Sequence, residues 1–328
     1  MKVCVFGAGA VGGHAAARMI ATGAAEVSVV ARGPHLEAIR ARGLTLRTEG
    51  REFTVRPVQA EENASKLGPQ DVVIVALKAH SQTAVAEDIA RLLAPSGVAL
   101  FGMNGIPWWW LHGRPDAGPL ETVDPGGALW RAIGPERALG AVVNSSNQVI
   151  EPGVIVHSGA KRWTIGEPDG SMSERAQRIA DVFNAADMDG VVTNDIRKEV
   201  WRKLMTNISG NPIAGLTRLP TRDMHAVNGL DELAVKLIAE ALLVAKAEGS
   251  DLNGEISPQS MVTPARGRAG GKSSMLQDVE AGRALEVDAL MTQVQNFARA
   301  HGVATPTIDT VQALLAGLDH ALRLARNA

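Results

Sequence analysis

The sequence predicts an α/β protein in which a doubly wound parallel sheet precedes a second, all-helical domain. Three observations support this prediction. A short apolar run, Lys2 to Phe6, leads straight into a glycine-rich segment. Strand-like and helix-like patterns then alternate, whereas from Ser173 onward the helical period dominates. The length of 328 residues favours two domains, since one domain spans roughly 100 to 200 residues, and we place them at 1–194 and 195–328.

The glycine-rich segment reads Gly7-Ala8-Gly9-Ala10-Val11-Gly12. In this spacing the first glycine permits a tight turn, the second lets the backbone approach a pyrophosphate, and the third lets a helix pack on the strand. The helix N-terminus adds free N–H groups and the positive end of its dipole. A helix-like stretch at 11–22 and a second strand at 26–31 complete a βαβ unit. We therefore predict a Rossmann-type dinucleotide site here rather than an ordinary turn.

Further strands follow in the first domain. Buried parallel strands are expected at 71–78 and 98–101, because these runs are rich in Val and Ala and lack polar alternation. A hairpin is expected at 44–48 and 52–56, around Glu49-Gly50-Arg51. Three strand-like runs that should extend the sheet lie at 140–149, 154–157 and 163–166.

The second domain is expected to consist of helices. It begins with the helix that carries Trp201, and a long amphipathic helix follows from Asn228 to about Gly249. Another helix is expected over 286–302. The Gly/Arg/Ser-rich stretch at 265–274 is expected to be a mobile loop.

Arg32 stands at the end of the second strand, where dinucleotide enzymes distinguish their cofactors. An acidic residue there binds the ribose hydroxyls of NAD, whereas an arginine accepts the 2′-phosphate of NADP. The sequence reads Val29-Val30-Ala31-Arg32 and has no acid at this point. Although an arginine after a strand is often only a surface residue, the glycine motif before it favours NADP.

Lys78 and Asn104 each follow a predicted parallel strand. Lysines and Asn-Gly turns are common in loops, so neither residue type is informative by itself. Ligands of open α/β sheets, however, bind beyond the carboxyl ends of the strands. Their position therefore makes both residues candidates for a binding site.

The helix around Trp201 carries a polar row of Lys203, Asn207 and Asn211. The spacing of four residues keeps these side chains on one side of the helix, beside apolar neighbours. A single helical lysine is usually a solvated surface charge. Asparagine is a poor helix former, however, and is commonly retained for its hydrogen bonds, so the row indicates the wall of a binding site.

The segment from Ser273 to Glu286 is expected to start a helix, with Ser273 as its N-cap. A well-capped surface helix explains Ser273. It does not explain Glu286, which lies beyond an Ala-Gly-Arg interruption and is a further candidate site residue.

Composition excludes several classes of function. The net charge of −2 gives no reason to expect nucleic acid or an anionic membrane as a partner. The single cysteine, Cys4, is expected to fill the core, and His14 and Arg18 interrupt any secretory signal, so we expect a cytoplasmic protein. Neither a metal-ligand pattern nor a serine-hydrolase motif occurs in the sequence.

Taken together and in order along the chain, these motifs resemble the ketopantoate reductase (2-dehydropantoate 2-reductase) family. The markers are the glycine motif, Arg32, Lys78, Asn104, the row from Trp201 to Asn211, and Ser274-Met-x-Gln-Asp followed by Glu286-Val-Asp. The resemblance implies an NADPH-dependent reduction of ketopantoate to pantoate in pantothenate and coenzyme A biosynthesis. It also implies that the glycine motif and Arg32 bind NADP, with Lys78 and Asn104 beside it.

The resemblance further implies that Lys203 donates the proton and that Asn207, Asn211 and Ser274 hold the substrate. Asn104 would contact cofactor and substrate, and Glu286 one or the other. The chemistry agrees with this assignment. Hydride transfer to a 2-keto carbon leaves negative charge on oxygen, which a nearby ammonium stabilises and protonates. Burial should lower the pKa of Lys203, and Glu286 should oppose that change.

The chain departs from the family after Asn104-Gly105, where Trp108-Trp109-Trp110 follows. These rings either pack in the interior or shape a pocket for a bulkier 2-keto acid. Two other kinds of function also stay open: a related dehydrogenase of 3-hydroxy acids or opines, and a non-catalytic NADP-binding sensor. An intact Lys203 argues against the sensor. The sequence leaves the oligomeric state, a homodimer included, undecided.

Overall fold

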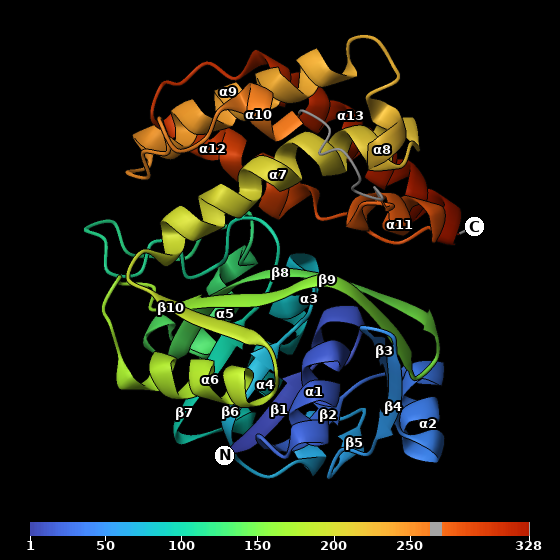
Figure 1. Ribbon diagram of the computed structural model, residues 1–328. Coiled ribbons are helices and arrows are strands. Elements are labelled where there is room, and N and C mark those ends of the chain that lie inside the picture. The colour runs from blue at the N-terminus through green and yellow to red at the C-terminus, as the bar shows by residue number, and fades with distance from the viewer. Residues whose placement is uncertain (263–270, 328) are drawn as a thin grey trace. The chain divides into compact units, whose positions relative to one another are not determined.

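The computed structural model describes residues 1–262 and 271–327, and the chain forms two compact units (Figure 1). Unit 1 comprises Met1–Met103 and Pro107–Ile196, and unit 2 comprises Asn104–Ile106 and Arg197–Ala328. Most of the expected loop at 265–274 lies outside the described residues. Among the described helices, none has both the length and the apolar composition needed to cross a membrane.

Four parallel strands form the centre of the sheet in unit 1, as the sequence predicts. In the order in which they pair, they are β7 (Leu93–Phe101), β6 (Gln70–Val75), β1 (Lys2–Phe6) and β2 (Glu26–Val30). Phe6 pairs with Val30 on one side and Val75 on the other. The carboxyl ends of these strands therefore finish at one level, where a ligand binds in this kind of sheet.

The rest of the sheet is built from longer and edge strands. They are β8 (Ala138–Glu151), β9 (Val154–Gly166), β3 (Leu44–Thr48), β4 (Arg51–Val55), β5 (Ala60–Glu61) and β10 (Asp189–Thr193). The β3–β4 hairpin is antiparallel, which confirms the prediction, and β3 joins the sheet beside β9.

Two expectations about these strands are wrong. The segments expected as separate strands at 154–157 and 163–166 form the single strand β9, because a bulge opposite Ser145 and Ser146 takes up Gly159 and Ala160. The strand β10 lies where only helices were expected after Ser173. It pairs with β9, a contact between distant residues that no local pattern reveals.

Helices cover both faces of the sheet in unit 1. They are α1 (Ala10–Thr22), α2 (Gly33–Arg42), α3 (Ala79–Gln82), α4 (Ala86–Leu92), α5 (Ala128–Ala132) and α6 (Glu174–Ala185). Figure 1 shows α1 and α6 on one face and α4 with α5 on the other. The βαβ unit β1–α1–β2 forms as the glycine motif predicts.

The described part of unit 2 contains helices and no strands. Its helices are α7 (Ile196–Thr217), α8 (Thr221–Met224), α9 (Leu230–Ala247), α10 (Pro258–Val262), α11 (Ser274–Glu280), α12 (Gln293–Ala300) and α13 (Pro306–Asn327). The expected helix at 286–302 is divided into a π-helical turn, η5 (Asp288–Thr292), and α12. Ser273 caps α11 as predicted, since its hydroxyl accepts a hydrogen bond from the Leu276 N–H.

The tryptophan run belongs to unit 1, and each of its rings is at most 1% exposed. Trp108 packs edge-on against Phe101 and Trp130, at centroid distances of 5.3 and 6.4 Å. Trp109 lies so close to Gly140 that a Cβ there would stand 2.4 Å from the ring. These contacts support the packing alternative for the run.

Candidate dinucleotide pocket and catalytic cluster

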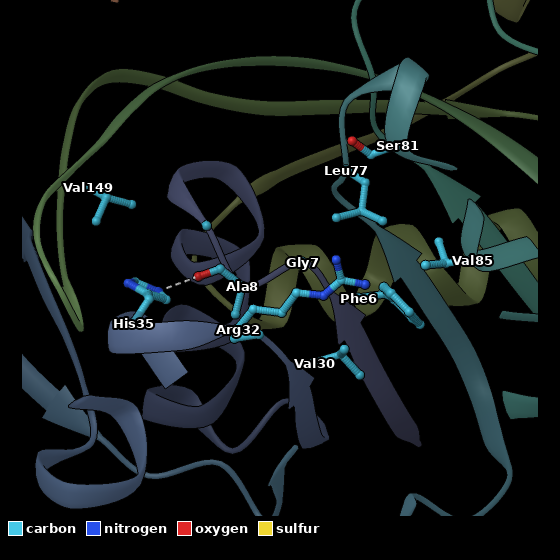
Figure 2. Close-up of a pocket in the computed structure, with 12 residues that line it drawn as sticks. Phe6, Gly7, Ala8, Val30, Arg32, His35, Leu77, Ser81, Val85 and Val149 are labelled. Carbon is cyan, nitrogen blue, oxygen red and sulfur yellow. Dashed lines mark hydrogen bonds between the residues drawn. The ribbon is translucent and has the colours of Figure 1, made fainter. Parts of the chain in front are cut away.

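A pocket of about 410 Å³ lies beyond the carboxyl ends of β1 and β2 in unit 1 (Figure 2). It is lined by Phe6, Gly7, Ala8, Gly9, Val30, Ala31, Arg32, His35, Leu77, Ser81, Val85 and Val149. The glycine motif thus forms part of the pocket wall, at the position in the sheet that the motif predicts.

Each glycine of the motif has the geometry expected of it. Gly7 has φ +98°, a conformation that L side chains rarely adopt. Gly9 faces open space, because a Cβ built there meets no atom within 4 Å. A Cβ on Gly12 would stand 2.3 Å from the Gly7 carbonyl oxygen and 2.8 Å from Val5, so α1 packs tightly on β1.

The backbone of this loop is held by β2. The N–H groups of Gly7 and Ala8 both donate to the Val30 carbonyl, at 3.0 and 3.2 Å. Ala10 and Val11 begin α1, and no side chain of the described residues caps that first turn. The N-terminus of α1 therefore suits an anionic ligand.

Arg32 is exposed, precedes α2 and lines the pocket, and Figure 2 shows its side chain extended beside the glycine loop. Lys78 is placed differently. It precedes α3 and is half-buried. In the sequence it lies between two residues that line the pocket, Leu77 and Ser81, but it does not line the pocket itself. The structure thus brings Arg32, but not Lys78, to the pocket wall beside the glycine loop.

Sequence reasoning missed two residues of this region. Gly13 is as constrained as Gly12, since a Cβ on it would stand 2.1 Å from Ile155. His35 contacts the glycine loop through its Nε2, which lies 2.7 Å from the Ala8 carbonyl oxygen. The doubled glycine at 12–13 is a signal in the sequence that could have identified Gly13. For His35 the only such signal is its position three residues after Arg32.

The remaining predicted site residues gather in unit 2. Lys203, Asn207 and Asn211 lie on α7, as predicted. Asn207 Nδ2 lies 3.5 Å from Asn104 Oδ1, and Asn104 Nδ2 lies 3.3 Å from Glu286 Oε2. These contacts bring together residues that are far apart in the sequence.

Asn211 contacts the other predicted substrate residue, since its Nδ2 lies 3.5 Å from Ser274 Oγ. Ser274 is the first residue of α11 and follows the capping Ser273. The polar row of α7 therefore meets Asn104, which in turn contacts Glu286, at its middle and Ser274 at its C-terminal end. We call Lys203, Asn104, Asn207, Asn211, Ser274 and Glu286 the polar cluster.

Backbone contacts hold the segments that carry Asn104 and Glu286. The Ile106 N–H donates to the Ala289 carbonyl in the π-helical turn at 2.9 Å. Gly105 has φ +80°, and a Cβ on it would stand 2.3 Å from that same carbonyl oxygen. Such π-helical turns are frequent at functional sites.

Asp319 fixes the start of the Glu286 segment from α13. Its Oδ1 accepts a hydrogen bond from the Leu285 N–H at 2.8 Å, and its Oδ2 accepts one from Arg323 at 2.7 Å. Asp319 is itself buried. The segment that carries Glu286 is therefore tied down on either side of this carboxylate, by Asp319 before it and the Ala289 carbonyl after it.

Burial lowers the pKa of Lys203 to about 8, while the negative charge of Glu286 opposes the decrease. Both effects have the direction that the sequence predicts. No hydrogen bond or ion pair joins the Lys203 side chain to another of the described residues. The cluster thus presents an ammonium, amides and a hydroxyl, the groups that bind a small keto acid and protonate its oxygen.

The described residues contain no group of three or more His, Cys, Asp or Glu side chains arranged to hold a metal ion. The Cys4 thiol is buried, and its burial raises its pKa to about 12, so it is an inert core residue.

Comparisons with known proteins agree with this geometry. Residues 3–170 match the family model described as ketopantoate reductase PanE/ApbA, and residues 195–319 match the model of its C-terminal part. The chain is 43% identical over 320 residues to a 2-dehydropantoate 2-reductase from Mesorhizobium japonicum, and the match covers 96% of this chain and 97% of that protein.

Solved structures show the same likeness. A 2-dehydropantoate 2-reductase from Geobacter metallireducens GS-15 has a TM-score of 0.85 at 26% identity, and the match covers 97% of this chain and 99% of that one. A D-mandelate dehydrogenase solved with NADH and anilino(oxo)acetate has a TM-score of 0.85 at 18% identity, with 98% and 100% coverage, and shows a shared fold. The match to the family model over residues 3–170 and the 43% identity to a named member show that the chain belongs to the ketopantoate reductase family.

Proposed function

We propose that this member of the ketopantoate reductase family reduces 2-dehydropantoate to pantoate with NADPH. The observation that carries the proposal is the polar cluster of unit 2, in which Lys203 has a pKa of about 8 among amide, hydroxyl and carboxylate groups. The chain is thus an oxidoreductase whose substrate is a small keto acid. The choice of ketopantoate rests on the 43% identical relative, whose name specifies this reaction.

The pocket of unit 1 fits a dinucleotide. The open space at Gly9 leaves room for a pyrophosphate against the backbone, and the uncapped first turn of α1 offers N–H groups to it. Arg32 and the residues of the motif, from Gly7 to Gly12, would hold the cofactor. The exposed guanidinium of Arg32 would bind a 2′-phosphate, which favours NADPH over NADH.

The residues of the polar cluster have distinct proposed roles. A bound nicotinamide supplies the hydride. Lys203 stabilises the charge that develops on the keto oxygen and then protonates it, because a pKa of about 8 leaves the amine charged at neutral pH yet able to release its proton. Asn207, Asn211 and Ser274 would hold the substrate's carboxylate and hydroxyl groups.

Glu286 and Asn104 have proposed roles in orientation. Glu286 keeps the Lys203 ammonium charged by its own negative charge. Asn104 donates to Glu286 and lies beside Asn207, so it would orient the substrate against the cofactor. Lys78, half-buried before α3, would add a positive charge near the cofactor.

The proposal is tested by following NADPH and NADH oxidation at 340 nm with ketopantoate, 2-ketoisovalerate and bulkier alkyl or aryl 2-keto acids. We expect ketopantoate to be reduced most efficiently, with NADPH preferred. Activity confined to bulkier keto acids would refute the assigned substrate and make the tryptophan run the basis of specificity. Absence of activity with every keto acid would refute the proposal and favour a 3-hydroxy acid dehydrogenase or an NADP-binding sensor.

Arg32→Ala tests the cofactor preference. A charge-assisted contact contributes about 1.5 to 3 kcal/mol, so the variant should raise the Michaelis constant for NADPH at least tenfold and leave that for NADH nearly unchanged. Arg178→Ala, at an exposed position of α6, is the matched control. Equal effects of Arg32→Ala on both cofactors would show that Arg32 does not bind the 2′-phosphate.

A homodimer in the cytoplasm is part of the proposal. A ketopantoate reductase from Staphylococcus aureus, described as dimeric, matches the chain with a TM-score of 0.76 at 22% identity and 98% coverage. Light scattering during size-exclusion chromatography measures the mass directly. A species near 34.5 kDa would be a monomer and would contradict this part.

A further inference from the structure

His35 sits in the first turn of α2, one turn after Arg32. It is half-buried and lines the pocket, and Figure 2 shows its ring directed at the Ala8 carbonyl. The turn itself is built for this position, because Gly33, the first residue of α2, has φ +53° and Pro34 follows it in the first turn. One turn of α2 thus presents Arg32 to the pocket and His35 to the glycine loop.

The two ring nitrogens of His35 have different partners. The Gly153 N–H, at the turn between β8 and β9, donates to Nδ1 at 3.1 Å. Nδ1 must therefore be unprotonated, so the proton of the neutral ring is on Nε2. Nε2 then donates to the Ala8 carbonyl oxygen at 2.7 Å. His35 thereby links the glycine loop to a turn more than a hundred residues away in the sequence.

We propose that His35 is a positioning residue for the dinucleotide, which it serves by fixing the peptide between Ala8 and Gly9. A trans peptide is planar, and its carbonyl and N–H point in opposite directions. Holding the Ala8 carbonyl on His35 therefore also fixes the direction of the Gly9 N–H. None of the described residues accepts a backbone hydrogen bond from that N–H, which leaves it for a phosphate oxygen.

His35 acts through the loop and not through a hydrogen bond to the cofactor. Both of its nitrogens are used by backbone groups, so neither can bind a phosphate without breaking one of these bonds. The open space beside Gly9 is where the oriented N–H would meet its ligand. The inference rests on the proposed dinucleotide binding and assigns to it a residue outside the glycine motif.

Two substitutions separate the two hydrogen bonds of His35. In His35→Gln the amide nitrogen replaces Nε2 and keeps a donor for Ala8. In His35→Asn the amide oxygen replaces Nδ1 and keeps an acceptor for Gly153, but the donor to Ala8 is lost. Glu37→Gln, at an exposed position of the same helix, is the matched control.

The test is calorimetric titration of the full chain with NADPH and with NADH, together with steady-state kinetics and circular dichroism. We expect His35→Asn to raise the dissociation constant of NADPH about fivefold, as the loss of one neutral hydrogen bond does. We expect His35→Gln to stay within about twofold of the wild type. The loss in His35→Asn should fall on the Michaelis constant for NADPH more than on the turnover number, because both ring nitrogens of His35 contact backbone groups of the loop and the Gly153 turn.

Two results would overturn the inference while leaving the proposed function intact. One is wild-type affinity in a folded His35→Asn protein. The other is an equal loss in His35→Asn and His35→Gln, which would trace the effect to the fit of the ring and not to its bond with Ala8. If the wild type bound neither NADPH nor NADH, the proposed function and the inference would both be refuted.

Discussion

Replacing Lys203 with methionine should stabilise the protein while it removes the proposed proton donor. Burial lowers the pKa of Lys203 from 10.5 to about 8, so the folded protein disfavours the charged form. Each pKa unit corresponds to about 1.4 kcal/mol, so holding the ammonium in this site costs about 3 kcal/mol at pH 7. Methionine has a similar length and carries no charge, so this cost disappears in the variant.

The sign of the pH dependence makes the prediction specific. Below pH 8 the lysine is charged in both the folded and the unfolded protein, and the full cost is present. Between pH 8 and 10.5 the folded protein releases the proton while the unfolded chain still binds it, so the wild type gains stability as pH rises. The advantage of Lys203→Met should therefore fall from about 3 kcal/mol at pH 7 to about 1 kcal/mol at pH 10.

Urea unfolding followed by far-ultraviolet circular dichroism measures this difference at the two pH values. Lys236→Met, at an exposed position of α9, is the control and should show no pH-dependent gain. A Lys203→Met protein that gains no stability at pH 7, or gains as much at pH 10 as at pH 7, would refute the argument. The predicted gain in stability with loss of turnover is the trade-off typical of active sites.

The remaining predictions concern the two sites separately. Glu286→Gln removes the charge that supports the Lys203 ammonium, so the pH above which kcat/KM falls should move lower, and an unchanged profile would argue against their coupling. Gly9→Ala places a methyl group in open space and should weaken NADPH binding at least tenfold with no change in thermal stability. Gly12→Ala forces a Cβ to within 2.3 Å of the Gly7 carbonyl oxygen and should lower the free energy of unfolding by about 2 kcal/mol or more. A variant with the melting temperature of the wild type would contradict the packing argument.

The parts of the fold that local pattern determines were predictable. Four buried strands, the β3–β4 hairpin and α9 follow from the periodicity of their own residues. The strand β10 did not, because its five residues carry no alternation and are held by pairing with β9. The bulge in β9 was not predicted for a related reason. A glycine such as Gly159 indicates a turn as readily as a bulge, and only the pairing with β8 distinguishes the two.

The candidate site divides in the same way. The row on α7, the open space at Gly9 and the close packing at Gly12 follow from spacing alone. The grouping of Asn104 with unit 2 depends on the Ile106 bond to Ala289, which joins residues far apart in the sequence. His35 was missed because its function depends on the Gly153 turn, which only the folded chain brings near it.

The account depends most on Lys203 as the proton donor, and one measurement tests it directly: single-turnover reduction of ketopantoate by NADPH-loaded wild type and Lys203→Ala, with Lys236→Ala as control. We predict that Lys203→Ala binds NADPH normally and slows the hydride step about 10² to 10⁴-fold, the usual contribution of a general acid. A Lys203→Ala protein that reduces ketopantoate at nearly the wild-type rate would remove Lys203 from the mechanism.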